Sequence, residues 1–121
     1  MVKIFVYGTL KKGYGLNGRL KGCNFIGEGI LEGFQLYCNG YYPMIQHSKN
    51  QSSIVKGEIY EVEDNKTLAE LDSIESAYNR TKVKVKCNDE MLEVEVYVYA
   101  YDIVGDDWNS WNKFEGDDWS K

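Results

Sequence analysis

One carboxylate, that of Glu75, carries the strongest chemical signal in the sequence. Four side chains of the segment 64–78 recur at the spacing of one helix face: Leu68, Leu71, Glu75 and Tyr78. Burial on such an apolar stripe raises the pKa of a carboxyl group, and a value near neutrality suits proton transfer in both directions. The alternatives are a structural ion pair, with Arg80 as the partner, or a carboxylate that reaches solvent at the helix end.

A second candidate site is the turn that ends the first β-rich run, formed by Tyr7, Gly8, Thr9 and Leu10. A glycine at the end of a strand lets the backbone turn and lets a ligand approach closely. The backbone amides of such a turn form a small anion nest that suits a carboxylate. An ordinary strand-ending turn is the alternative.

Two further segments offer contacts to a ligand. Gly13–Gly18 matches the pattern GxGxxG, but five residues separate it from the strand and no helical stripe follows, so dinucleotide binding is not expected. We expect a glycine-rich loop from which Asn17 and Arg19 can reach a polar ligand. Pro43, the only proline, is expected in a turn or in the wall of a pocket.

The elements that position these residues are about six strands and one helix. The expected strands are Lys3–Tyr7, Cys23–Ile30, Gly33–Cys38, Gly57–Glu63, Thr81–Cys87 and Met91–Tyr101. Asp64 or Asn65 can cap the helix, because its side-chain oxygen accepts from the free amides of the first turn. Helix and strands do not alternate as βαβ units, so the expected fold is α+β, a small mixed or antiparallel β-barrel with one main helix.

The last two strands are expected to form a hairpin whose turn is Asn88–Asp89. The pairs predicted by this turn are Val85–Leu92, Val83–Val94, Lys84–Glu93 and Lys82–Glu95. Apolar residues then oppose each other on one face and opposite charges on the other, and a slip of one residue would lose both sets. Tyr97, Tyr99 and Tyr101 share one face of the final strand, and such aromatic faces usually pack against a neighbouring element.

Composition limits the function classes. The three cysteines and the single His47 fit neither a disulfide framework, a zinc site nor a His-dependent triad. No apolar run of about 18 residues and no signal peptide is present, so we expect a cytoplasmic protein without a membrane partner. The 121 residues allow one domain, which we place at residues 1–101. Residues 102–121 hold six acidic and two basic residues and all three tryptophans, and are expected to pack on the domain or trail from it.

Three motifs follow one another along the chain. They are VYGTLKKG at Val6–Gly13 with Asn17 nearby, GEIYEVE at Gly57–Glu63, and LDSIESAYNRTKVKV at Leu71–Val85. In this order they resemble the gamma-glutamylcyclotransferase-like superfamily, and within it the gamma-glutamylamine cyclotransferase branch. The matches span residues 2–101.

The resemblance implies a small barrel with short flanking helices and a cofactor-independent enzyme without a metal. Family members convert a gamma-glutamyl compound into 5-oxoproline and a free amine or amino acid. The family's catalytic glutamate corresponds to Glu75, its substrate loop to Tyr7–Leu10 and the arginine after its helix to Arg80. Asn17, Pro43 and Tyr99 complete the expected substrate site. Glu75 would act as general base and then as general acid.

Two other functions are considered. A non-catalytic module on the same fold would bind a small ligand or a protein, but it has no use for a buried proton shuttle. A barrel that binds nucleic acid would use the basic stretch Lys11, Lys12, Arg19 and Lys21. We expect instead a small-molecule gamma-glutamyl substrate, no nucleic-acid partner, and a monomer or weak homodimer.

Overall fold

A computed structural model of the protein describes residues 2–8, 10–13, 17–38, 43–47, 53–74, 78–99 and 112–113. The elements in chain order are β1 (Val2–Val6), a short 3-10 helix η1 (Asn17–Leu20), β2 (Asn24–Glu32), β3 (Phe34–Cys38), β4 (Pro43–His47), β5 (Ile54–Val62), α1 (Asn65–Ile74), β6 (Tyr78–Cys87), β7 (Glu90–Tyr99) and β8 (Asn112–Lys113).

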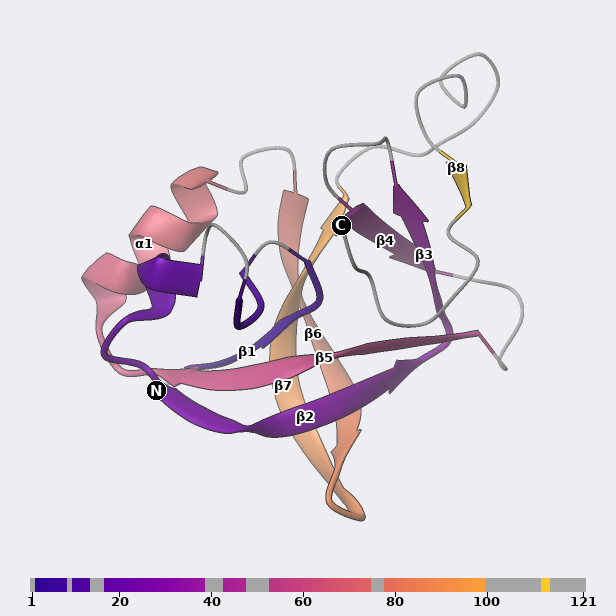
Figure 1. The fold of residues 1–121 in the computed structure, drawn as a ribbon, viewed down its shortest axis with the longest axis horizontal. Coiled ribbons are helices and arrows are strands. Elements are labelled where there is room, and N and C mark those ends of the chain that lie inside the picture. The colour runs from indigo at the N-terminus through magenta and orange to yellow at the C-terminus, as the bar shows by residue number, and fades with distance from the viewer. Residues whose placement is uncertain are drawn as a thin grey trace.

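Five strands close into a barrel in the order β1-β5-β2-β6-β7. The pairs along this order are antiparallel, and the barrel is closed by a parallel pairing of β1 with β7. The strands β4, β3 and β8 form a second, smaller sheet, which lies across the barrel from α1 in Figure 1. The expected mixed sheet that curls into a barrel with one main helix is therefore confirmed.

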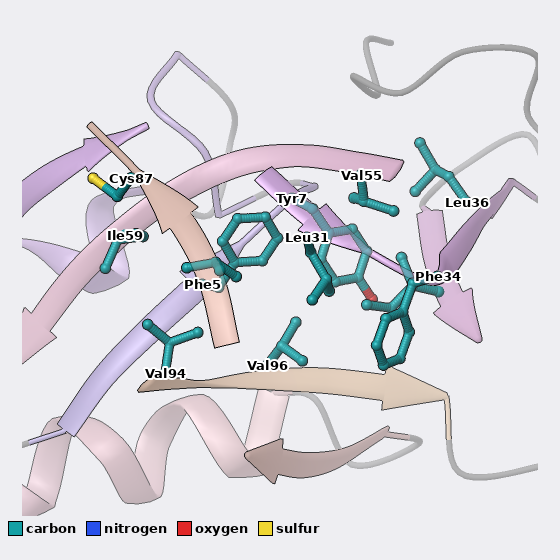
Figure 2. Packing of buried hydrophobic residues seen from close by; sticks show 12 residues of the cluster. Phe5, Tyr7, Leu31, Phe34, Leu36, Val55, Ile59, Cys87, Val94 and Val96 are labelled. Carbon is teal, nitrogen blue, oxygen red and sulfur yellow. The ribbon is translucent and has the colours of Figure 1, made fainter. Parts of the chain in front are cut away.

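Alternate residues of the same strands fill two places, the barrel interior and the apolar layer between the barrel and α1. On β1, Phe5 points into the barrel, as does Tyr7 just beyond the strand, whereas Ile4 and Val6 belong to the cluster that packs against Leu71 of α1. Figure 2 shows the Phe5 and Tyr7 rings in the interior, together with Leu31, Phe34, Val55, Ile59, Val94 and Val96. The period-two pattern of a strand thus gives the barrel two apolar layers.

Gly57 lets β1 and β5 approach closely. A Cβ atom at this position would collide with the carbonyl oxygen of Val6 and would lie 2.7 Å from Cζ of Phe5. The glycine at the start of the GEIY motif is therefore required by packing between two neighbouring strands.

The helix begins as expected and ends earlier. The backbone N–H of Lys66 donates to Oδ1 of Asp64 over 2.9 Å, which confirms Asp64 as the cap. The predicted helical stripe that included Tyr78 is wrong, because α1 ends at Ile74 and Tyr78 is the first residue of β6. Tyr78 still packs against the cluster that contains Leu71. The two residues at helical spacing therefore share one apolar cluster, although one lies on a helix and the other on a strand.

The predicted hairpin register is confirmed at all four pairs. The partners are Val85–Leu92, Val83–Val94, Lys84–Glu93 and Lys82–Glu95. Asn88 and Asp89 have φ values of 48° and 66°, the left-handed conformation of a two-residue hairpin turn. The ladder also continues to the pair Tyr78–Tyr99, which brings the start of β6 beside the end of β7.

Two strands were not expected from the sequence. β4 begins at Pro43, where a turn or pocket wall was predicted, and proline is tolerated there because the first residue of a strand need not donate to the ladder. β8 lies in the tryptophan-containing segment and pairs with Tyr37 and Cys38 of β3. The division into residues 1–101 and 102–121 stays a prediction. Across the described ranges, no helix is long and apolar enough to cross a membrane.

Candidate active site

The predicted substrate loop leaves β1 at its buried end. Tyr7 is buried inside the barrel, and its hydroxyl donates to the backbone carbonyl of Tyr97 over 2.8 Å. The chain then turns, with the backbone N–H of Lys11 donating to the carbonyl of Gly8 over 2.9 Å. Leu10 is buried in the cluster under α1 and so fastens the loop to the helix side of the barrel. Thr9 lies outside the described residues, and the anion nest stays a prediction.

A polar cluster on β5 holds the far side of this loop. The side-chain amide of Asn17 donates to the carbonyl of Leu10 over 2.8 Å and to the hydroxyl of Tyr60 over 3.2 Å. Oε1 of Glu58 accepts from the Tyr60 hydroxyl over 3.1 Å and from the backbone N–H of Lys12 over 2.8 Å. The second motif, GEIY, therefore supports the first motif, the loop that begins YGTL.

Glu58 and Tyr60 were not predicted as site residues. Their signal in the sequence was their i, i+2 spacing, which puts both side chains on one face of β5. Asn17 was predicted as a substrate contact, and the structure shows its amide bonded to the loop and to Tyr60. Whether it also contacts a substrate stays a prediction.

Two groups in this neighbourhood, the Tyr60 phenol and the Cys23 thiol, have raised pKa values. Burial raises the pKa of the Tyr60 phenol, the charge of Glu58 acts in the same direction, and the hydrogen bond from Asn17 partly opposes them. Burial also raises the pKa of the Cys23 thiol, with the Asp64 carboxylate adding to the effect. Both groups are therefore held in the protonated form at neutral pH, so Tyr60 is available to donate to Glu58.

A second polar cluster joins α1 to β6 and β7. The Tyr97 hydroxyl donates to Oδ1 of Asp72 over 2.8 Å. The guanidinium of Arg80 pairs with Asp72 through Nη1 at 3.3 Å and with Glu95 through Nε at 3.2 Å. These four side chains form one connected group, which we call the Asp72–Arg80 network.

Arg80 was predicted to bind substrate, and the structure holds its guanidinium between two carboxylates. Its Nη1 is buried and, although it lies near Asp72, it has no aligned hydrogen-bond acceptor within the described residues. The substrate role of Arg80 stays a prediction.

The other predicted site residues are placed only in part. Glu75 lies outside the described residues, directly after α1, so its proposed pairing with Arg80 is not described either. Pro43 is the first residue of β4 and Tyr99 the last of β7, and these two strands pack against each other. Met44, next to Pro43, is fully buried against Tyr78. The backbone positions of Pro43 and Tyr99 thus lie near the start of β6, where the chain returns from Glu75.

A metal site would need several ligands in one place. Over the residues with a described placement, no group of three or more His, Cys, Asp and Glu side chains is arranged to hold a metal ion.

Comparisons with known proteins identify relatives of this chain. It is 41% identical over 87 residues to a Pyrococcus horikoshii protein whose provisional name is gamma-glutamylcyclotransferase PH0828, with 70% of this chain and 71% of that protein covered. It is 39% identical over 106 residues to Methanocaldococcus jannaschii MJ1514, which has the same provisional name, with 84% and 85% covered. It is also 37% identical over 103 residues to the gamma-glutamylaminecyclotransferase of Rattus norvegicus, with 71% and 64% covered.

Two solved structures have folds similar to that of this chain. The crystal structure of PH0828 superposes with a TM-score of 0.73 at 31% identity, covering 98% of this chain and 89% of that one. The crystal structure of an AIG2-like protein from Mus musculus superposes with a TM-score of 0.77 at 30% identity, covering 95% and 86%. The family model described as gamma-glutamyl cyclotransferase, AIG2-like, matches residues 4–121. The fold, the three motifs and these matches together show that the chain belongs to the gamma-glutamylcyclotransferase, AIG2-like family.

Proposed function

We propose that this protein is a cyclotransferase acting on a gamma-glutamyl amine or a gamma-glutamyl amino acid. The reaction releases 5-oxoproline and the free amine or amino acid, and Glu75 serves as general base and then general acid. The proposal rests on membership of the family and on the three motifs, which follow one another in this order along the chain.

The observation that carries the proposal is the position of Tyr97 between two motifs. Its backbone carbonyl accepts the hydroxyl of Tyr7, the first residue of YGTL, and its own hydroxyl donates to Asp72, the second residue of the LDSIE sequence. The start of the proposed substrate loop and the helix turn that leads to Glu75 are therefore bonded to one and the same residue.

The chemistry needs little more than orientation and one proton carrier. The substrate's α-amine nitrogen bonds to its own γ-carbonyl carbon, and the bond from that carbon to the leaving nitrogen then breaks. Glu75 takes the proton that the attacking nitrogen loses and delivers it to the leaving nitrogen. Because the attack is intramolecular, holding the glutamyl part in a ring-closing geometry supplies much of the rate. Loop amides around Gly8 would hold the α-carboxylate or polarise the carbonyl.

The proposal is tested by incubating the purified protein with gamma-glutamyl-lysine isopeptide, several gamma-glutamyl amino acids and glutathione. Release of 5-oxoproline and of the free amine is followed by chromatography. Wild-type protein is expected to turn over at least one of these compounds. Glu75→Gln is expected to lower kcat by about 10²–10⁴-fold, the usual contribution of a positioned general acid–base group.

Glu70→Gln is the matched control, because Glu70 is an exposed carboxylate on α1, the helix that ends directly before Glu75 in the sequence. It is expected to keep wild-type activity, which separates loss of the Glu75 carboxylate from a general effect of charge on α1. A Glu75→Gln protein with full activity would contradict the role of Glu75. Tight binding of a gamma-glutamyl compound by wild-type protein without any turnover would favour a binding module.

A further inference from the structure

We infer that Tyr97 and Asp72 are positioning residues, which set the placement of the segment that carries Glu75 relative to the substrate loop. This inference rests on the proposed function, because it assigns the network a part in that reaction. Asp72 belongs to the third motif and Tyr97 lies on β7. The proposed mechanism gives neither residue a chemical step.

The first step of the argument is that Asp72 and Arg80 bracket the residues 75–77. Asp72 lies two residues before the last residue of α1, and Arg80 is the third residue of β6. Their ion pair, with Nη1 and Oδ2 3.3 Å apart, joins the chain just before this segment to the chain just after it. The last turn of α1 and the start of β6, which flank residues 75–77, are therefore linked by this ion pair.

The second step is that β7 holds this bracket in place on the barrel. Arg80 and Tyr97 are direct partners in the antiparallel ladder, so their side chains point to the same face. On that face, the Tyr97 hydroxyl donates to Asp72 over 2.8 Å and Glu95 pairs with the Arg80 guanidinium at 3.2 Å. We call the Asp72–Arg80 ion pair the bracket. It is attached to β7 twice, through Asp72 on the helix side and through Arg80 on the strand side.

The third step links the bracket to the loop. The Tyr97 backbone carbonyl accepts the buried hydroxyl of Tyr7, and Tyr7 directly precedes Gly8. Tyr7 packs inside the barrel and Asp72 lies on the helix side. Tyr97 of β7 therefore links the two sides of the barrel wall, with its backbone carbonyl bonded to Tyr7 and its side chain bonded to Asp72. A displacement of Tyr97 would change the distance between the loop and the bracket.

The substrate loop has an independent attachment that does not involve this network. Asn17, Tyr60 and Glu58 bond the loop to β5, on the other side of β1 in the barrel order. Removing one tyrosine hydroxyl from each cluster therefore gives a matched pair of variants. Tyr97→Phe loosens the bracket, and Tyr60→Phe loosens only the loop.

The test compares kcat, KM and amide hydrogen exchange for wild type, Tyr97→Phe, Asp72→Asn and Tyr60→Phe. Since a misplacement of about 1 Å can cost about 10²-fold in rate, Tyr97→Phe and Asp72→Asn are expected to lower kcat by about 10–100-fold, with KM within about threefold of wild type. Tyr60→Phe is expected to raise KM while kcat stays within about threefold. Exchange is expected to quicken around residues 72–80 in the first two variants and around 10–17 in the third.

Asp72→Asn keeps the inference testable if Tyr97→Phe fails to fold, because the Asp72 side chain is 45% exposed and lies outside the core. An active wild type whose kcat is unchanged in both bracket variants would overturn the inference and leave the proposed function standing. An equal loss of kcat in Tyr60→Phe would also overturn it, because the effect would then be a general loosening of the barrel. A wild type that releases no 5-oxoproline from any substrate would overturn the proposed function and this inference together.

Discussion

Replacing Gly57 by alanine tests whether the contact between β1 and β5 sets the stability of the barrel. The added Cβ would collide with the Val6 carbonyl and would stand 2.7 Å from Cζ of Phe5, whereas ordinary van der Waals contacts lie at 3.4–4 Å. Neither neighbour can move freely, because Val6 is paired with Glu58 in the ladder and Phe5 is fully buried in the barrel.

The magnitude follows from these two constraints. Overpacking a well-packed site costs about 1–3 kcal/mol, and weakening one ladder hydrogen bond adds about 1 kcal/mol. Gly57→Ala is therefore expected to lower the free energy of unfolding by about 2–4 kcal/mol, or Tm by about 8–16 °C for a chain of this length. Urea unfolding followed by circular dichroism measures the change.

Two other glycines provide the controls. A Cβ at Gly29 would lie 3.1 Å from Cδ1 of Ile59 and 3.2 Å from Cε1 of Phe5, side-chain atoms that can give way, so Gly29→Ala is expected to cost about 1 kcal/mol. A Cβ at Gly18 would meet nothing within 4 Å, and Gly18→Ala should change stability by no more than about 0.5 kcal/mol. If Gly57→Ala unfolds at the same urea concentration as Gly18→Ala, the packing argument is refuted.

Two further predictions concern the helix and the loop support. Leu71 is fully buried between α1 and the barrel, so Leu71→Ala should lower the free energy of unfolding by about 2–5 kcal/mol, against a smaller loss for half-buried Leu68→Ala in the same urea assay. The raised pKa of Tyr60 means that the unfolded chain loses this proton first, so the stability from the neutral phenol is fully present below about pH 10 and is lost as pH rises through the folded value. When the pH is raised from about 8 to about 11, a range that includes the ordinary phenol pKa of about 10, the free energy of unfolding should therefore fall less for Tyr60→Phe than for wild type. An identical fall in the two proteins would refute the assignment.

Local patterns predicted part of the fold because the information lay within a few residues. The β6–β7 register followed from alternation and the Asn88–Asp89 turn, since a slip would have mixed apolar and charged faces. The helix end was not predicted correctly, because Tyr78 is buried against Leu71 from a strand and spacing alone does not identify the element. β4 and β8 were missed because their pairing with β3 is set by tertiary contacts, and one of them starts at a proline.

The residues of the candidate site also fall into those that local patterns could select and those that depend on tertiary contacts. The loop at Tyr7–Leu10 and the residue Asn17 could be selected from glycine placement and the family resemblance. The supporting contacts of Glu58, Tyr60 and Asp72 could not, because they include partners that lie 25 or more residues away, namely Lys12, Asn17 and Tyr97. A carboxylate or phenol on a strand face looks solvent-exposed in a sequence until the element that covers it is known.

The parallel pairing of β1 with β7 also bears on the order in which the chain folds. Ile4 and Phe5 are paired with Glu95 and Val96, so the barrel cannot close until β7 has been synthesised, about 90 residues after β1. The β6–β7 hairpin is local and can form early, whereas the β1–β7 closure joins the most distant strands of the barrel and carries the largest loop-closure entropy. During synthesis β1 can therefore pair with β5 before β7 emerges from the ribosome, but its other edge lacks a partner until β7 has been synthesised.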